Sequence, residues 1–591
     1  MEVLDLRLYR VTLLPFAALL IIAAFSLHAP SATPASAPPA QTFDTAQAAS
    51  EMAKLADSYP DRAPGTGGDD ALAAQLAHTA PPGGFADAGF TSVRVVSSSV
   101  ETAAGAATVR TVIATRAGTG PGIALIADRG GSQQGDSAAT LAPTATLLEL
   151  AFIYKTLLTS RPLTLVSTSG GASAMGVVAP LLPPDIEAAI VIGDVADPGG
   201  RGPYVVPWSA SGALAPVELR RSVETAIAGA IARKVADVSL TQQMAQLALP
   251  LTTGEQGLLG ADGIPAVLVT ADGQAQPSDA SPDASLMGAF GQGLLGVTSV
   301  LEGSSASLAT APTRDLAFGS QVLSGWAVRA VVGALLLSLL GCTLDVLARA
   351  RRRRVVVGPL IVWVLSFAAP FALAGLFAAS LGAGGLLPAT PAAAVTPAQL
   401  PVSGEGVASL VSIGLLFVLA WVLRAAARAR AGRHRPADPV GATAALLIVA
   451  SATAALLWIA NPYTAALLII PAHLWLVVLT REHERTPSLG ALCIVVSLAP
   501  LAAAVGLICS VLHVEPLALA WTLALLVAGG GLSPYGLLLF SLSAGSLVAA
   551  AALLLRRGGI GPDTRVEVTV RGPLSYAGPG SLGGTESALH R

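Results

Sequence analysis

The stretch that decides the fold begins with the apolar run Ile123-Ala124-Leu125-Ile126-Ala127 and continues through a polar loop to Met175. The apolar run predicts a buried strand, and the run Leu163-Thr164-Leu165-Val166 predicts a second one. Between them, residues 142–158 contain Leu147-Leu148-Glu149-Leu150-Ala151 and predict a helix. Strand, helix and strand in this order are typical of an α/β layer.

The same alternation extends to both sides of this stretch, so residues 42–305 are predicted to form one α/β domain. The other strands are predicted at residues 90–97, 109–116, 188–192 and 266–270. The other helices are predicted at residues 42–59, 69–80, 217–235 and 286–302.

The composition separates this domain from the rest of the chain. Of 591 residues, 53% are hydrophobic and 12% are charged, whereas soluble proteins carry about 25% charged residues. The deficit is concentrated after residue 324, where apolar runs of roughly 17–25 residues are each long enough to cross a bilayer. The net charge of −2 gives no reason to expect a nucleic-acid partner. All three cysteines, Cys342, Cys493 and Cys509, lie in these apolar runs, so no disulfide is expected in the α/β domain.

The predicted organisation has six parts. A membrane anchor covers residues 1–28, and a Pro/Ala-rich linker covers 29–41. The α/β domain at 42–305 is followed by a second linker at 306–323. A membrane domain of about eight helices covers 324–556. The chain ends in a tail at 557–591, in which residues 564–570 alternate like a strand.

Basic residues set the predicted orientation, because cytoplasmic loops of membrane proteins are enriched in Lys and Arg. Arg7 and Arg10 precede the first apolar run, which places the N-terminus in the cytoplasm and the α/β domain outside it. The chain is therefore predicted to be a multi-pass protein of the cytoplasmic membrane. An uncleaved first span is favoured over a cleaved signal peptide. Two points stay open: whether residues 516–530 span or re-enter the membrane, and on which side the tail lies.

Four landmarks in the α/β domain resemble one family. They are the turn Arg62-Ala63-Pro64-Gly65-Thr66, the helix-ending Gly89-Phe90, the helix with Leu147-Leu148-Glu149, and the turn Gly263-Ile264-Pro265. Their order and spacing are similar to those of the family-twenty-eight zinc metallopeptidases, which are aminopeptidases with two zinc ions. The resemblance covers residues 42–305 and implies a mixed sheet between helices.

The metal-binding positions of that family have lost almost all their ligands here. The resemblance places them at Asp128, Gly130, Ala138, Gly170, Gly171, Asp194 and Ala280, and only Asp194 keeps a ligand of the family's type. Residues 40–320 contain one histidine, His78, although a site of this kind needs two. Without zinc there is no activated water, and without a glutamate at Gly170 or Gly171 there is no general base. The resemblance therefore implies a chain that has no metal or other cofactor and is not an enzyme.

Two other features are candidates for binding. The acids and the serine near the expected pocket predict a binding cleft formed by Asp128, Asp136, Ser169, Asp194 and Glu255. The alternatives for the acids are calcium binding through oxygen ligands and simple exposure to solvent. In the membrane domain, His473 is the ionisable residue nearest the middle of a span. It either has a functional role or forms a hydrogen bond between helices.

The predicted function is that of an inactive, peptidase-like membrane protein. It would bind or position a protein or lipid-linked partner at the outer face of the cytoplasmic membrane, in contact with membrane lipids. The architecture is similar to the membrane attachment subunit of the GPI-anchor transamidase and to endoplasmic-reticulum metallopeptidases, although the Ala-, Gly- and Arg-rich composition suggests a bacterium. One alternative is an active membrane metallopeptidase or hydrolase with unconventional residues. Another is a lipid or small-solute transporter with an accessory domain.

Overall fold

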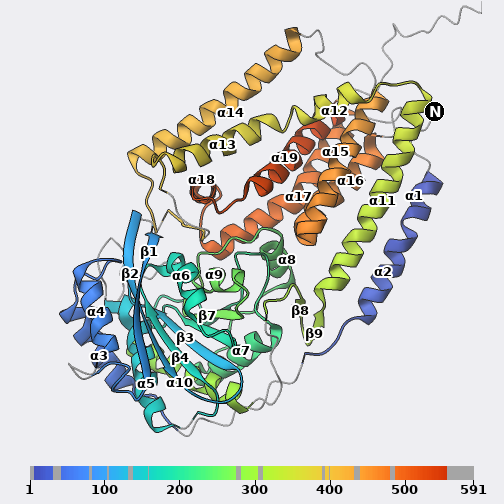
Figure 1. Cartoon of the computed structure of the whole chain (residues 1–591). Coiled ribbons are helices and arrows are strands. Elements are labelled where there is room, and N and C mark those ends of the chain that lie inside the picture. The colour runs from blue at the N-terminus through green and yellow to red at the C-terminus, as the bar shows by residue number, and fades with distance from the viewer. Residues whose placement is uncertain are drawn as a thin grey trace, which may run out of the picture.

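The chain folds into an α/β part and a helical part that lie side by side (Figure 1). The structure is a computed structural model. It describes residues 6–30, 41–78, 83–102, 105–130, 138–157, 159–274, 281–303, 311–388, 393–397, 399–430, 439–479 and 486–555. The predicted tail strand at 564–570 lies outside these residues.

The α/β part is built on a seven-stranded sheet with the order β1-β2-β4-β3-β5-β7-β6. The central strands β3, β4, β5 and β7 are parallel, while β1, β2 and β6 are antiparallel to their neighbours. The sheet is therefore mixed, as predicted. The bounds are β1 Ser92–Thr102, β2 Gly105–Arg116, β3 Gly122–Asp128, β4 Leu163–Thr168, β5 Ile186–Ile192, β6 Tyr204–Val206 and β7 Ala266–Thr270.

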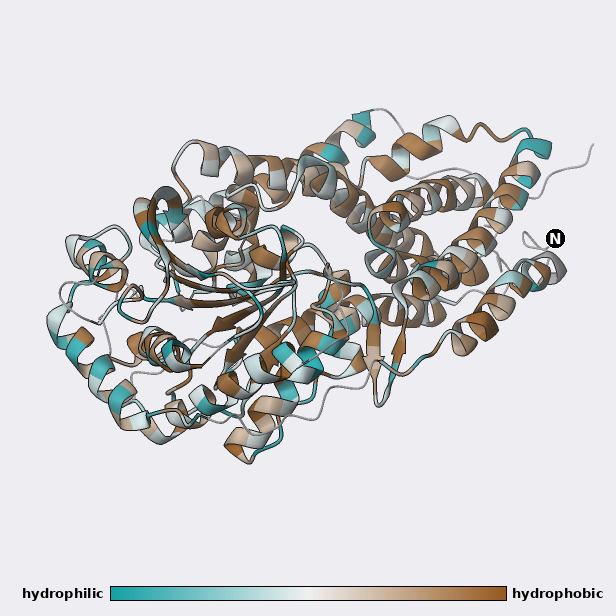
Figure 2. Ribbon diagram, turned by 60° about the horizontal axis from the view of Figure 1, so that its bottom comes forward, coloured by the Kyte–Doolittle hydropathy of each residue, from teal (hydrophilic) through white to brown (hydrophobic). Residues whose placement is uncertain are grey.

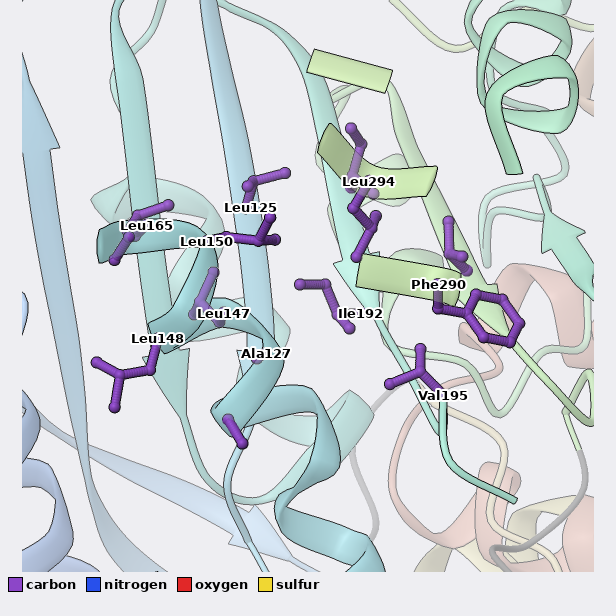
Figure 3. Packing of buried hydrophobic residues seen from close by; sticks show 14 of the residues in the cluster. Leu125, Ala127, Leu147, Leu148, Leu150, Leu165, Ile192, Val195, Phe290 and Leu294 are labelled. Carbon is purple, nitrogen blue, oxygen red and sulfur yellow. The ribbon is translucent and has the colours of Figure 1, made fainter. Parts of the chain in front are cut away.

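Helices cover both faces of this sheet. The bounds are α3 Thr45–Ser58, α4 Gly67–Ala77, α5 Ala142–Thr156, α6 Met175–Val178, α7 Val217–Ile231, α8 Leu240–Ala248, α9 Gln256–Ala261 and α10 Ala284–Gly303. Because side chains alternate along a strand, β3 sends Leu125 to one face and Ile126 to the other. Leu125 belongs to a buried cluster that also contains Leu147 of α5 and Phe290 of α10 (Figure 3). Ile126 belongs to a second cluster with residues of α6 and α9. The predicted α/β fold with its sheet between helices is confirmed.

The sequence predicted the central strands and the longer helices but missed several short elements. The elements β6, α8 and α9 were not expected, because they are short and lack the longer continuous apolar run that marks β3 and β7. The helix predicted at residues 217–235 ends at Ile231, where Ala232 takes a left-handed conformation with φ of 53°.

The helical part consists of apolar helices. The bounds are α1 Leu6–Thr12, α2 Leu14–Phe25, α11 Gly325–Arg352, α12 Gly358–Leu365, α13 Ala369–Ala383, α14 Gly404–Arg430, α15 Pro439–Ala460, α16 Pro462–Leu479, α17 Pro487–Leu512, α18 Ala518–Ala528 and α19 Pro534–Leu554. These helices are hydrophobic along most of their length, whereas the outer helices of the α/β part carry polar residues (Figure 2). A short hairpin of β8 Leu316–Phe318 and β9 Gln321–Leu323 connects the two parts.

Seven helices of the described chain are long and apolar enough to cross a membrane, and the bent pair α12–α13 raises the number to eight. One of the seven is α10, which packs against the sheet in the core of the α/β part. The others are α11, α14, α15, α16, α17 and α19. Within residues 516–530, α18 has 11 residues, so this helix alone is too short to span a bilayer.

Candidate functional site

The carboxyl end of β3 brings together the positions that the family resemblance singled out. Asp128 is the last residue of β3, and its Oδ1 accepts a hydrogen bond of 2.7 Å from the N–H of Gly130. A Cβ atom at Gly171 would lie 3.5 Å from Oδ2 of Asp128. Gly170 and Gly171 have φ values of 99° and 60°, a left-handed conformation that favours glycine. A glutamate at either position would therefore strain the backbone.

Glu255 lies close enough to Asp128 to feel its charge, although the two are 127 positions apart in the chain. It precedes α9, and its Oε2 atom is buried without a hydrogen-bond partner among the residues that the structure describes. Burial raises the pKa of Asp128 to about 6. Burial and the nearby Asp128 charge raise the pKa of Glu255 well above its usual value. The pair therefore takes up a proton more readily than solvated acids do.

This pair predicts a pH effect on stability. The pKa of Asp128 is about 6 in the folded chain against about 3.9 in an unfolded one. Between these two pH values, Asp128 is protonated in the folded chain and ionised in the unfolded one. Its proton therefore stabilises the folded state fully below about pH 4, and this contribution is lost as the pH rises through about 6. The variant D128N is expected to lose less stability in thermal melts between pH 4.5 and 7.5 than the parent chain. The variant D57N, which changes an exposed acid of α3, is the control. Equal pH slopes for D128N and the parent would contradict this prediction.

Beneath the acid pair lies a buried ion pair that the sequence analysis missed. Arg129 and Asp69 are fully buried, and Nε of Arg129 is 2.8 Å from Oδ1 of Asp69. Arg129 also donates to the backbone oxygens of Ser167 and Arg110. Ser169, a predicted cleft residue, is fully buried and donates to Oδ2 of Asp69 over 2.6 Å. The hydroxyl proton of Ser169 is thus already donated to the buried ion pair.

Asp194 does not join the pair. Burial raises its pKa to about 6, and the nearby charges that contribute to this rise are Asp197 and Asp272. Its Oδ1 accepts the N–H of Ala196 over 3.1 Å, while Oδ2 is buried without a partner in the described chain. Asp194 thus follows β5 at the same edge of the sheet as Asp128, but the charges that raise its pKa come from Asp197 and Asp272.

The remaining predicted positions are peripheral or undescribed. Ala138 begins a short 3-10 helix that ends at Leu141. Asp136 and Ala280 lie outside the described residues. His78 is exposed at the C-terminal end of α4. No group of three or more His, Cys, Asp or Glu side chains that could hold a metal ion occurs among the residues described. This donor set does not fit a site for two zinc ions.

A surface hollow of about 600 Å³ lies elsewhere in the α/β part. Its lining includes Ile186 and Ile264, at the amino ends of the parallel strands β5 and β7. Asp128 is at the carboxyl end of a parallel strand, which is the opposite edge of the sheet. The hollow is therefore separate from the acid pair.

The carboxyl edge of the sheet meets the helical part. The N–H of Ala394, in the segment between α13 and α14, donates to the backbone oxygen of Thr252 over 3.2 Å. Thr252 is three residues from Glu255, and its hydroxyl accepts from the side chains of Gln256 and Gln274. Figure 1 shows the connection between α13 and α14 reaching the α/β part. The loop that carries Glu255 is thus in contact with the helical part.

His473 joins three helices. Its Nε2 lies 3.0 Å from the backbone oxygen of Leu335 in α11, and its Nδ1 lies 3.2 Å from the hydroxyl of Tyr9 in α1. Because a carbonyl only accepts, Nε2 carries the proton and Nδ1 accepts from Tyr9. These bonds fit the predicted hydrogen bonding between helices.

Comparisons with known proteins find a remote likeness to solved structures. No family model and no curated protein matches the chain. Among solved structures, a leucine aminopeptidase precursor from Bacteroides thetaiotaomicron is 15% identical, with a TM-score of 0.35, over 44% of this chain and 97% of that one. A glutaminyl cyclase from the same organism, bound to N-acetylhistamine, is 14% identical, with a TM-score of 0.35, over 44% and 98%. A Zn-dependent exopeptidase from Parabacteroides distasonis is 13% identical, with a TM-score of 0.32, over 44% and 98%.

Likeness at this level is remote and assigns no activity to this chain. By its own architecture the chain is an α/β protein with a mixed sheet between helices and a second part of apolar helices.

Proposed function

We propose that this chain is a catalytically inactive, peptidase-like membrane protein that holds a protein or lipid-linked partner at the outer face of the cytoplasmic membrane. The observation that carries this proposal is the contact between Ala394 and Thr252, since it places the loop of Glu255 against the helical part. A ligand at the acid pair would lie beside the membrane helices. This position suits a partner that is itself anchored in the membrane.

The inactivity rests on the residues at the carboxyl edge of the sheet. Glycines stand at positions 130, 170 and 171, and the left-handed backbone of the last two disfavours any side chain there. Hydrolysis of the zinc-dependent kind needs a metal-bound water and a base. The glycines at 170 and 171, where the family resemblance expects the glutamates that act as base and metal ligand, support the proposed loss of this chemistry.

The orientation rests on the basic ends of two helices. The α/β part lies next to the first residues of α11 and α14, while their last residues lie on the far side of the molecule (Figure 1). The far ends carry the exposed arginines Arg351 and Arg430. Because basic residues are enriched on the cytoplasmic side, these arginines support an α/β part that lies outside the cytoplasm.

A zinc and activity measurement tests the inactivity. The purified full-length chain, incubated with zinc and then dialysed, is expected to retain well under one zinc per chain and to release no amino acid from aminopeptidase substrates. Stoichiometric zinc together with hydrolysis would refute the proposal and favour the active alternative.

Co-purification tests the partner. The parent chain and the double variant D128N/E255Q are isolated from native membranes under gentle conditions, with D57N as the matched surface control. A protein or lipid that accompanies the parent and D57N but is lost from the double variant is the expected result. If no partner accompanies any of the three, the holding function is wrong.

A further inference from the structure

The span formed by α12 and α13 is broken at Ser366, Phe367 and Ala368, and the two helices meet at an angle of 43°. A break of this kind frees backbone oxygens that need donors inside a membrane. Arg424 of α14 supplies one of these donors. Its Nε donates to both the backbone oxygen and the hydroxyl of Ser366, each over 3.1 Å.

Aromatic rings hold this guanidinium in place. The Cζ atom of Arg424 lies 3.4 Å from the ring centre of Phe367 and 5.3 Å from that of Trp421. One turn further along α14, Cζ of Arg428 lies 5.8 Å from the ring of Trp363. Trp363 and Phe367 are buried and pack edge to face at 4.9 Å. The guanidinium groups of Arg424 and Arg428 therefore pack on one cluster of aromatic rings, which fixes their orientation.

The two terminal nitrogens of Arg424 are available to a ligand. Its bonded nitrogen is Nε, and Nη1 and Nη2 have no hydrogen-bond partner among the residues described. The neighbouring side chains of Leu419, Val422 and Leu423 are at least half exposed. Figure 1 shows α14 at the periphery of the helical part, next to α13. In a bilayer these apolar side chains face lipid, so the unused donors lie where lipid headgroups meet the helix end.

The geometry points to a binding site for the phosphate of an anionic phospholipid, formed by Arg424 and Arg428 at the bend between α12 and α13. The planar fork of a guanidinium matches two phosphate oxygens, and the bonds are charge-assisted. Arg424 is held at Nε and by the rings, so its fork is already oriented for the ligand. The site requires that the helical part lie in a bilayer, and it is independent of the acid pair.

Lipid retention tests this site. The full-length chain is reconstituted in nanodiscs with equal amounts of phosphatidylglycerol and phosphatidylcholine, released, and analysed by native mass spectrometry. Retained phosphatidylglycerol is expected to fall about tenfold in R424Q and in R428Q, since each variant loses a charge-assisted bond to the phosphate. The matched control is R351Q, an exposed arginine at the end of α11, which is expected to retain lipid like the parent.

Arg424 also stabilises the bend, so lipid loss in a poorly folded R424Q would not test the binding site. The variant R428Q then provides the test, because it keeps Arg424 and its bond to Ser366. Undiminished retention in a folded R428Q would overturn the site. A thermal-shift series on the parent separates the two sources of phosphate. Stabilisation by phosphatidylglycerol but not by millimolar inorganic phosphate is expected, and equal stabilisation by both would overturn the assignment to a lipid.

Discussion

Replacing Arg129 with methionine is expected to destabilise the α/β part by about 3–5 kcal/mol, because it leaves the buried Asp69 carboxylate without its cation. Arg129 and Asp69 are both fully buried, and no solvent replaces the lost partner. The loss also frees the backbone oxygens of Ser167 and Arg110, which Arg129 now satisfies. In thermal unfolding of the full chain in detergent, the midpoint of the α/β transition is expected to fall by on the order of 10 °C.

The control is an ion pair of the same residue types at the surface. Arg110 and Asp70 are 3.0 Å apart, with side chains 43% and 34% exposed. Exposed pairs contribute about 0–1 kcal/mol, so R110Q is expected to shift the midpoint little. If R129M and R110Q lower the midpoint equally, the buried pair does not hold this edge of the sheet together.

The sequence predicted the central strands because their signal is local. Strands β3 and β4 are buried on both faces, so every residue from Ile123 to Ala127 is small or apolar, and the pattern is visible without the rest of the chain. The helix α5 was predicted for a similar reason. Its buried residues follow one another along a single segment.

The site was only partly predictable because it depends on contacts between distant residues. The family resemblance brought Asp128, Gly170 and Gly171 to one place, and the structure does the same. It gave no reason to pair Arg129 with Asp69, although an arginine directly after a buried strand was a signal worth following. Ser169 was expected at an open cleft because it directly precedes Gly170 and Gly171. Its burial follows from Asp69, which lies 100 residues earlier in the chain.

The helical part shows the same division between local and distant information. Apolar length is local, so the helices could be predicted one by one. Hydropathy does not predict how helices pack. Packing determines both the bend between α12 and α13 and the contact of Ala394 with Thr252. The bonds of Arg424 to Ser366 depend on the same packing and became evident from the structure alone.

The double variant N461L/T464V is expected to loosen α8 and so detach the α/β part from the helices. In the structure, Nδ2 of Asn461 donates to the backbone oxygen of Leu247 over 2.6 Å, and the hydroxyl of Thr464 donates to that of Ala248 over 2.7 Å. These oxygens belong to the last turn of α8, which has no further turn of helix to satisfy them.

Leaving both oxygens without a donor costs about 1–3 kcal/mol each, so amide hydrogen exchange in α8 is expected to accelerate at least about tenfold in the full chain. The variant T156V is the control, because the hydroxyl of Thr156 donates to a carbonyl of its own helix at an exposed position. Unchanged exchange in α8 would mean that these two bonds do not couple the parts. Faster exchange in α8 that extends to residues 252–255 would show that the loop of Glu255 depends on the membrane helices for its position. That dependence is what a domain holding a membrane-anchored partner requires, because its cleft must keep a fixed place above the bilayer.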